Sequence, residues 1–493
     1  MSKRCLIRPP ASVDLRVIQR RNQIYDFLEN PEIQSKMHKI LRFFLLIVCI
    51  SSVKTNRVYV HPFNLFSLDN VSCETVKAQA EKPLKTVKLT HIEPQDSMGP
   101  DIHTLKMAEE GRPSSTQHTS VLASLQNPLG LRLYHAIKKQ KGTNTMFSPI
   151  NAFGALVTFY LGASKHTASD LQQFLGLVKE TDKVYCVSLF DGHKVLQTLR
   201  DIGSLTEETK NELRTTTWTF VSTKADVSED FAQGTQDFSD TSYIRAVDFS
   251  QPQEAEARVN AFIQTTSPGK IKHLFKAISP ESDLLFASSV YFKGNWGTAF
   301  QPEVSSQQEF WVDEKTSIKV PLLTQTGTYK YFNDKGRKCA VVKLPLSGTM
   351  HMLLVLPHEG AHLDHIEAKL STDVISTWHK HLKEGLLEVS LPKFSVNAVS
   401  DLRTILTNMR LPNLLGPGAN LKRLSSKHHF SVDQVLNQVV FKMDAGDGSE
   451  NQDKTQDSGP ALKFTVNRPF MVAIIEGNSG AILLLGRIAN PTH

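Results

Sequence analysis

The sequence predicts a mixed α+β fold, because helix-like and strand-like segments are separated along the chain. Between Leu122 and Leu175, apolar residues recur with the 3.6-residue period of helices that bury one face. Beyond about residue 280, short runs rich in Val, Ile, Leu and Phe lie between turn residues, as strands do. Helices followed by strands indicate α+β rather than a repeating βαβ unit.

Three early segments are predicted to be helical. The first has apolar residues at Leu129, Leu133 and Ile137, which share one helix face. The second is apolar almost throughout, which is typical of a buried helix, and the third is amphipathic. In chain order, these helices are expected over Leu129–Lys138, Asn151–Leu161 and Thr167–Leu175.

Eight later segments are predicted to be strands, because each is short, rich in apolar residues and bounded by turn residues. They are Leu284–Phe292, Lys338–Leu344, His351–Leu356, Gly385–Leu391, Gln438–Met443, Lys463–Val466, Phe470–Glu476 and Ala481–Ile488. No internal repeat or clear linker interrupts the chain after residue 122, which favours one large domain.

The composition of the 493 residues excludes several classes of protein. With 40% hydrophobic residues, 26 glycines and 5 cysteines, the chain is neither collagenous, disulfide-stapled nor wholly disordered. The chain contains no run of 18 apolar residues, so it has no candidate for a membrane-spanning helix. Residues 1–55 hold ten Lys/Arg and four Asp/Glu, so they carry most of the net charge of +7. The remainder is near neutral, which argues against nucleic acid as a partner.

Residues 1–55 are interpreted as a leader that contains a signal peptide. Met37 is followed by basic residues and then by an apolar centre that ends near Val53, and cleavage after Thr55 would free Asn56 as the new amino terminus. We expect translation to start at Met37. A short membrane anchor is the alternative, but the apolar stretch is too short to span a bilayer. The leader therefore predicts a secreted, extracellular protein with no membrane insertion.

Two further features are compatible with secretion. Asn70 begins the single N-x-[ST] sequon whose middle residue is not proline, so it is a candidate glycosylation site. Removal of the leader leaves Cys73, Cys186 and Cys339, and the simplest arrangement of three cysteines is one disulfide and one free thiol. Cys339 lies in an apolar predicted strand, which favours a buried free thiol.

Several strings resemble the motifs of the serpin family, in the family's order, over about residues 125–493. They are Phe147-Ser-Pro149, Leu161-Gly-Ala163, Val259-Asn260 with Gly269-Lys-Ile271, Val290-Tyr-Phe-Lys-Gly-Asn-Trp296, Leu391-Pro-Lys-Phe394, Phe464-x-Val-Asn-Arg-Pro-Phe470 and Gly486-Arg-Ile-x-Asn-Pro491. The resemblance implies a serpin fold over residues 122–493, with three β-sheets, about nine helices and an exposed reactive-centre-type loop before Phe464.

The predicted reactive loop argues against protease inhibition. Inhibitory serpins insert this loop into a sheet, which buries alternate side chains and requires small residues. Here Asp447, Glu450, Gln452 and Lys454 stand in the loop. Charged residues stand at both odd and even positions of the loop. Whichever set of alternate side chains faces inward, an unpaired charge would be buried, at a cost of several kcal/mol. We therefore predict a non-inhibitory serpin. A serine protease inhibitor is the alternative, and a serpin that carries a small molecule also stays open.

The segment after the leader carries the predicted function. Residues 56–65 resemble the vasoactive decapeptide at the amino terminus of the hormone-precursor members of the serpin family, with the core Arg57-Val-Tyr-Val-His-Pro-Phe63. The family's peptide commonly has Asp where Asn56 stands and His where Asn64 stands. Residues 66–121 would form an N-terminal tail between this peptide and the serpin domain. The chain is thus predicted to be a precursor, not an enzyme, with no catalytic residues, metal or cofactor.

The resemblance implies cleavage by renin, an aspartic protease, between Leu65 and Phe66. Val58, Tyr59 and Val60 favour an extended backbone, and Pro62 disfavours helix at His61. Chain termini are mobile unless they are tied down. We therefore expect a mobile, extended segment that enters the protease cleft, with Leu65 and Phe66 in the two apolar pockets beside the scissile bond.

A second cut is implied for the released peptide. A dipeptidyl carboxypeptidase would remove Asn64-Leu65 and leave the octapeptide Asn56–Phe63, a ligand for a G-protein-coupled receptor. Four of its residues, Arg57, Tyr59, His61 and Phe63, are the predicted receptor-binding residues. Arg57 supplies a fixed cation, Tyr59 and His61 supply amphipathic rings, and Phe63 supplies both a ring and the new carboxylate.

The same resemblance implies a disulfide between Cys73 in the tail and Cys186 in the serpin body. In the chain-entropy model, a disulfide that closes a loop of about 100 residues stabilises the folded state by about 4.7 kcal/mol. The bridge is either a redox switch that controls presentation of the scissile bond or a plain structural staple, and the sequence leaves both open.

One zinc-protease pattern, His358-Glu-Gly-Ala-His362, is set aside. That chemistry needs a helix so that both imidazoles share a face, whereas this string follows Pro357 and contains Gly360. We predict a loop at this position and no metal site.

Overall fold

The structure is a computed structural model that describes residues 65–67, 83–92, 116–137, 143–178, 190–204, 211–267, 271–297, 300–427, 429–443 and 460–492. These residues contain nine α-helices: α5 (Thr116–Ala136), α6 (Pro149–Gly162), α7 (Lys165–Phe174), α8 (Gly192–Ser204), α9 (Glu229–Phe238), α10 (Pro252–Thr266), α11 (Leu363–Glu367), α12 (Thr372–His381) and α13 (Leu402–Asn408), with the 3-10 helix η1 (Pro412–Leu414).

The strands of the described residues form two hydrogen-bonded sheets. They are β1 (Thr90–His91), β2 (Thr145–Phe147), β3 (Glu212–Ser222), β4 (Thr241–Val247), β5 (Leu284–Gly294), β6 (Gln301–Trp311), β7 (Ser317–Asp334), β8 (Cys339–Pro345), β9 (His351–Pro357), β10 (Lys383–Pro392), β11 (Ser395–Asp401), β12 (Val432–Met443), β13 (Leu462–Thr465), β14 (Phe470–Ile475) and β15 (Ile482–Ile488).

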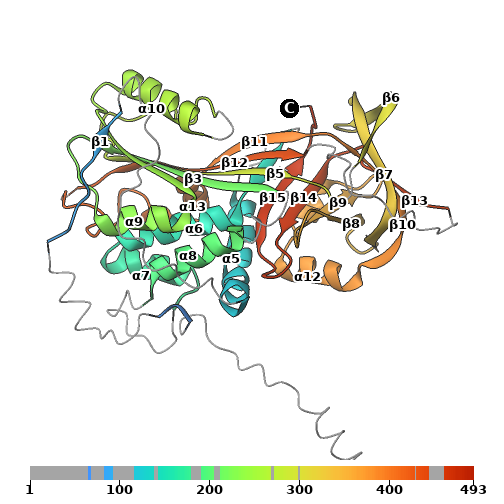
Figure 1. Ribbon diagram of the computed structural model, residues 1–493, viewed down its shortest axis with the longest axis horizontal. Coiled ribbons are helices and arrows are strands. Elements are labelled where there is room, and N and C mark those ends of the chain that lie inside the picture. Colours follow the sequence, from blue (N-terminus) through green and yellow to red (C-terminus); the bar gives the residue numbers. More distant parts are fainter. Residues whose placement is uncertain are drawn as a thin grey trace, which may run out of the picture. The chain divides into compact units, whose positions relative to one another are not determined.

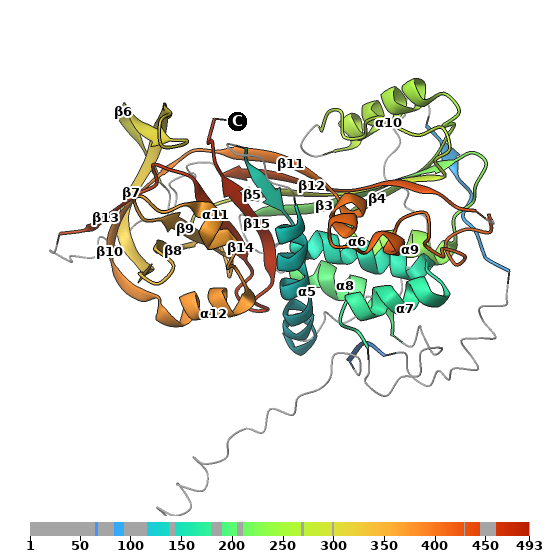
Figure 2. The same cartoon turned by 180° about the vertical axis from the view of Figure 1, so that it is seen from behind.

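The first sheet has six strands in the order β1-β4-β3-β5-β12-β11. Helix α10 covers one face of this sheet, and the bundle of α5 to α9 lies on the other (Figure 1). The alternation of side chains along β5 explains how both faces are buried: Leu285 and Ala287 pack with α10, whereas Leu284 and Phe286 belong to the core on the side of the helical bundle. Figure 2 shows the same layers from behind.

The second sheet has the order β13-β10-β7-β8-β9-β14-β15-β2, with β6 also paired to β7. This sheet has two portions that share the 18-residue strand β7. One portion contains β13, β10, β7 and β6, and the other contains β7, β8, β9, β14, β15 and β2. Strand β7 pairs with β6 and β10 along much of its length and with β8 at its end. Counted by portions, the architecture therefore has the three sheets that the serpin resemblance implies. The α+β class and the expected number of helices agree with the described residues.

Several predicted elements differ in extent from those observed. Helix α5 begins at Thr116, more than a turn before the predicted start at Leu129, and it contains Pro128. Strand β12 begins at Val432 rather than Gln438. Several observed elements are absent from the predicted set, because polar residues interrupt their apolar pattern. They are helices α8, α9, α10, α11, α12 and α13 and strands β1, β2, β3, β4, β6, β7 and β11.

Two sequence predictions about single features can be checked in the described residues. Cys339 is a free thiol with no exposed surface, as predicted. Burial raises the pKa of this thiol to about 12, so it stays protonated and unreactive. Among the described helices, none combines the length and apolar character that crossing a membrane requires.

Candidate functional site

The proposed scissile bond lies at the first described residues of the chain. Leu65 and Phe66 have helical backbone conformation, Leu65 is half-buried, and Phe66 has no exposed surface. The expectation of a mobile, extended chain is therefore wrong at these two residues. The reason is a set of contacts with the folded body, which ties the segment down and removes the freedom of a chain end.

The side chain of Phe66 is part of the main hydrophobic core. Its ring meets the ring of His118, in the first turn of α5, edge to face, with the centroids 5.7 Å apart and the planes at 70°. Full burial of a Phe side chain is worth about 1.5–3 kcal/mol, and an aromatic pair of this geometry adds about 0.5–1.5 kcal/mol. The residue that follows the proposed cut is thus held by the body.

The backbone of Phe66 is held as well. Its carbonyl oxygen accepts a hydrogen bond of 2.6 Å from the N–H of Asp191. The next residue, Ser67, pairs with Phe190 in an antiparallel bridge. The ring of Phe190 in turn stacks on Tyr160 of α6, at 4.0 Å between centroids and 20° between planes. We call Phe190 and Asp191 the platform, because the tail rests on both residues.

The platform is fixed by the helix that follows it. The carboxylate of Asp191 accepts a 3.0 Å hydrogen bond from the N–H of Lys194, and its carbonyl accepts one of 3.1 Å from the N–H of Val195. This is the pattern of an N-cap residue, which satisfies donors that the first turn of a helix leaves unpaired. Asp191 therefore has two roles: its side chain caps the amino terminus of α8, and its own N–H donates to the carbonyl oxygen of Phe66.

His118 is neutral around pH 7. Burial lowers the pKa of its imidazole, and the nearby charge of Lys194 lowers it further. A neutral ring is compatible with its contact with Phe66, because no charge has to be desolvated beside the phenyl ring.

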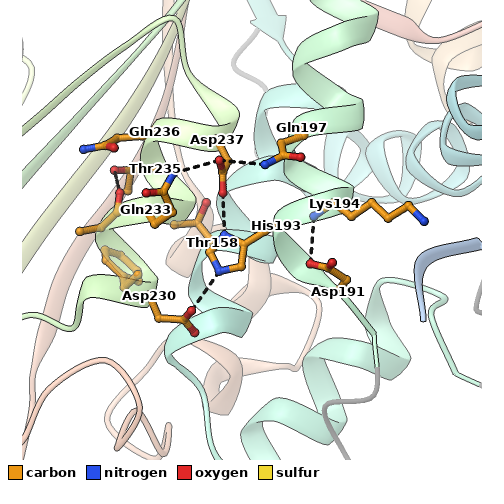
Figure 3. Close-up of polar contacts among 12 residues, drawn as sticks. Thr158, Asp191, His193, Lys194, Gln197, Asp230, Gln233, Thr235, Gln236 and Asp237 are labelled. Carbon is orange, nitrogen blue, oxygen red and sulfur yellow. Dashed lines mark hydrogen bonds and ion pairs between the residues drawn. The ribbon is translucent and has the colours of Figure 1, made fainter. Parts of the chain in front are cut away.

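A partly buried ionic cluster joins α8 to α9 close to Asp191 (Figure 3). The imidazole of His193 places Nδ1 2.6 Å from a carboxylate oxygen of Asp237 and Nε2 3.0 Å from one of Asp230. Asp230 and Asp237 are seven residues apart, which is about two helical turns, so both reach toward α8 from one face of α9. Asp237 also accepts hydrogen bonds of 3.1 Å from Gln197 and Gln233.

His193 is an imidazolium at neutral pH. Burial alone would lower the pKa of His193, but the hydrogen bonds and charges of Asp230 and Asp237 outweigh it and raise this pKa to about 10. The same interactions, together with Arg423 at 3.2 Å, lower the pKa of Asp230 against the opposing effect of burial. The cluster thus holds one partly buried cation between two carboxylates.

A second part of the tail is bound to the body at α9 and β4. The N–H of Glu229, in the first turn of α9, donates to the carbonyl of Lys85 at 2.9 Å, and the N–H of Val87 donates to the carbonyl of Val227 at 2.9 Å. Further along, β1 pairs in parallel with β4, where Thr90 lies opposite Arg245. Within its described residues the tail is therefore attached at two places, which we call the first anchor (Phe66 and Ser67) and the second anchor (Lys85 to His91).

Most sequence-predicted site residues lie outside the described residues. These are the leader cleavage residues Thr55 and Asn56, the peptide residues Arg57, Tyr59, His61, Phe63 and Asn64, the sequon residue Asn70, and the cysteines Cys73 and Cys186. The four polar loop residues Asp447, Glu450, Gln452 and Lys454 also lie outside them. For all of these residues the sequence expectations stay predictions.

The two strands between which the predicted reactive loop would insert, β5 and β12, are described. Strands β5 and β12 pair directly in parallel from Leu284 opposite Val432 to Gly294 opposite Met443, so no other strand lies between them. Within this seam Asn437 lies opposite Ser288, and both side chains are buried. The string His358 to His362 lies between β9 and α11, in the loop that the sequence predicts.

Sequence reasoning missed His118 and Asp191, which contact Phe66, and His193, which joins α8 to α9 beside them. A signal for Asp191 exists, because an N-cap residue precedes a helix with apolar residues at Val195, Leu196, Leu199 and Ile202. No local signal points to His193 or His118, because their partners Asp237 and Phe66 are 44 and 52 residues away in the chain.

The fold and the anchored tail define the class of protein. The family model described as "Serpin (serine protease inhibitor)" matches residues 124–491. The chain therefore belongs to the serpin family.

Within this family the chain is an angiotensinogen-like serpin. It is 31% identical to angiotensinogen of Bos taurus and 30% identical to that of Homo sapiens, each over 454 residues, which cover 88% of this chain and 94% of the relative. It is also 31% identical to the human protein Z-dependent protease inhibitor over 380 residues, covering 75% of this chain and 83% of the relative.

Solved structures share the same fold. The mouse protein-Z dependent protease inhibitor matches with a TM-score of 0.66 at 26% identity, covering 76% of this chain and 98% of that chain. Human thyroxine-binding globulin also has a TM-score of 0.66, at 23% identity, over 77% of this chain and 100% of that chain. At this identity the second likeness shows the fold alone.

Proposed function

We propose that the chain is the secreted precursor of a vasoactive peptide, and that its serpin body carries and presents that peptide without inhibiting proteases. One observation carries the proposal. The string Arg57-Val-Tyr-Val-His-Pro-Phe63 stands ahead of the serpin body, in a chain that is similar to angiotensinogens over 88% of its length. In this proposal the leader ends at Thr55, and the exported protein starts at Asn56.

Renin is the proposed first protease, and it cuts between Leu65 and Phe66. The product is an angiotensin I-like decapeptide, Asn56–Leu65. Angiotensin-converting enzyme then removes Asn64-Leu65 and leaves the octapeptide Asn56–Phe63 for a G-protein-coupled angiotensin receptor. The expected physiological outcome is regulation of blood pressure and of salt and fluid balance.

The described residues constrain how the first cut takes place. An aspartic protease binds its substrate extended, whereas Leu65 and Phe66 are helical and Phe66 is buried. We therefore propose that the first anchor opens before the protease binds. Opening breaks the hydrogen bond from Asp191 and exposes the phenyl ring, so the body lowers the fraction of molecules that can be cut at any moment.

The test is incubation of the purified secreted chain with renin, followed by mass spectrometry of the released material. The expected product has the mass of Asn56–Leu65, and the remaining body begins at Phe66. A Leu65→Asp variant is the matched control, since a carboxylate does not suit an apolar pocket and cleavage should be lost. Release of no decapeptide from the unsubstituted chain would contradict the proposal.

A second candidate, a serine protease inhibitor, is favoured by the description of the matching family and by similarity to the protein Z-dependent protease inhibitor. The charged residues at Asp447, Glu450 and Lys454 argue against it, because insertion of the loop between β5 and β12 would bury some of them. A complex with a serine protease that survives denaturation would favour this second candidate.

A further inference from the structure

We propose that His193 is a positioning residue for the cut between Leu65 and Phe66: by joining α8 to α9, it holds the platform of Phe190 and Asp191 against the tail and keeps the scissile segment closed. This inference rests on the function proposed above. It deepens that function by assigning control of cleavage to a group that does not touch the scissile bond.

The first step is geometric. His193 is the second residue of α8, and Asp191, whose N–H binds Phe66, lies two residues before it. The imidazole contacts carboxylates from the first and last turns of α9, at 3.0 and 2.6 Å respectively. One side chain therefore fixes the amino-terminal end of α8, in position and in orientation. The platform directly precedes that end, and Figure 3 shows its residue Asp191 beside His193.

The second step concerns the other side of the cluster. Helix α9 begins with the N-cap residue Ser228, whose hydroxyl accepts from the N–H of Phe231, and the first-turn N–H of Glu229 donates to the tail carbonyl of Lys85. The first turn of α9 thus binds the second anchor, and its Asp230 binds His193. His193 consequently connects the elements that hold the two anchors of the tail.

The third step concerns charge. The titratable groups around His193 are Asp191 just before α8, Lys194 on α8, Asp230 and Asp237 on α9, and Arg423, which reaches Asp230 from the loop before β12. Because the pKa of His193 is raised to about 10, the imidazolium persists throughout the range from pH 5 to pH 8. The contact is therefore a constant latch rather than a switch that responds to ordinary changes of pH.

The consequence for cleavage follows from the closed state of the tail. If renin cuts only molecules whose first anchor is open, a group that stabilises the closed state lowers the rate. Loss of the charged hydrogen bonds of His193 should loosen the platform and increase the open fraction. A synthetic peptide that spans the same bond carries no platform, so it lacks this restraint.

The experiment compares renin cleavage of the full chain with its His193→Gln and Asp230→Asn variants. We expect kcat/KM to rise about tenfold for His193→Gln, which corresponds to about 1.4 kcal/mol, and by a smaller factor for Asp230→Asn. Asp230→Asn retains the contact of His193 with the buried Asp237 and changes a half-exposed carboxylate, so it tests the idea even if His193→Gln folds poorly.

Two variants serve as matched controls. Arg423→Gln removes the other partner of Asp230 but leaves His193 in place, and Glu367→Gln breaks a buried ion pair with Arg487 that is distant from the tail. Both should leave kcat/KM within about twofold of the unsubstituted chain, even where the overall stability falls. A rise with Glu367→Gln equal to that with His193→Gln would mean that general destabilisation, not the latch, controls cleavage.

A second readout reports on the platform itself. Hydrogen–deuterium exchange of the segment that contains Asp191 should become about tenfold faster in His193→Gln, while exchange in the central strands β14 and β15 stays unchanged. Equal cleavage rates and equal exchange in the His193 and Asp230 variants would overturn the inference. Failure of renin to cut the unsubstituted chain, while it cuts the synthetic peptide of residues 56–69, would instead contradict the proposed function.

Discussion

The ring of His118 lies edge-on to the ring of Phe66, with the two centroids 5.7 Å apart. Through this contact, the first turn of α5 holds the residue that follows the proposed scissile bond. The contact brings together two residues that are 52 positions apart in the chain, and it joins the tail to the main hydrophobic core. It also makes His118 the most direct residue on which to test the closed state of the tail.

Replacement of His118 by Ala should increase the rate of renin cleavage. The lost aromatic contact is worth about 0.5–1.5 kcal/mol, which corresponds to a rise of about two- to tenfold if opening limits the cut. The measurement is the initial rate of decapeptide release at renin concentrations well below that of the substrate. A rate that stays equal to that of the unsubstituted chain would show that the ring contact does not restrain Phe66.

The reactive-loop segment should be cut by serine proteases as an ordinary substrate. The charged residues Asp447 and Lys454 resist burial between β5 and β12, so cleavage should yield neither a covalent complex nor a large increase in thermal stability. Gel electrophoresis under denaturing conditions and a melting curve before and after cleavage check this. An inhibitory serpin treated in parallel supplies the positive control, and a persistent complex with this chain would reject the prediction.

Acid should destabilise the protein through the pair His351 and His379. Their Nε2 atoms are 3.0 Å apart, and burial, aided by the charges of Lys343 and His379, lowers the pKa of His351 to about 3. In the unfolded chain His351 is protonated below about pH 6.5. Between this pH and about pH 3, the unfolded state therefore binds a proton at His351 that the folded state does not. Stability attributed to this group is therefore complete above pH 6.5 and falls as pH drops toward 3, by a total on the order of 4 kcal/mol.

The measurement is urea unfolding of the unsubstituted chain and of His351→Gln at several pH values between 4 and 7. The variant should lose less stability on acidification, because Gln does not titrate. His381→Gln is the control, since His381 is an exposed residue of the same region. If His351→Gln and the unsubstituted chain lose stability in parallel, the buried pair is not the source of acid sensitivity.

Substitution of Gly486 by Ala should be severely destabilising. A Cβ atom at this position in β15 would lie 2.2 Å from the backbone oxygen of Thr145 in the paired strand β2, and backbone cannot rotate away as a side chain can. We expect a loss of at least about 3 kcal/mol, above the usual range for overpacking. Gly360→Ala serves as the comparison. A Cβ atom at this position would meet no atom within 4 Å, so only the φ of +71° disfavours alanine there.

Gly360→Ala should cost about 1–2 kcal/mol, the strain of a left-handed backbone in a residue with a Cβ. Chemical denaturation of both variants distinguishes the two effects. Equal losses at the two positions would mean that strand β2 moves to make room beside Gly486, which would contradict the close packing inferred here.

The fold could be predicted in outline because short segments of the sequence indicate its helices, strands and family motifs. The strings around Phe147, Trp296 and Phe470 resemble serpin motifs, and each lies in or beside a strand that forms the core. Long strands with mixed burial were missed. In β7, buried and exposed residues do not alternate strictly, because the strand serves two portions of a sheet in turn. A pattern with a period of two is lost where the partner strands change.

The candidate site could be predicted only in part, for a different physical reason. Leu65 and Phe66 stand out as apolar residues after a distinctive string, and that much is visible in one dimension. The helical conformation and burial of Phe66 depend on Asp191, 125 residues later, and on His118. No local propensity signals such contacts, so the sequence suggested a free end where the body supplies a binding surface.

The second anchor has a consequence for the material left behind after the peptide departs. The two residues of β1 lie along the outer edge of β4, at the rim of the six-stranded sheet. The proposed cut falls upstream of β1, so the spent body keeps this cover, and no additional unpaired edge is opened to neighbouring molecules. The body that remains after the proposed cut should consequently resist self-association as well as the uncut chain does.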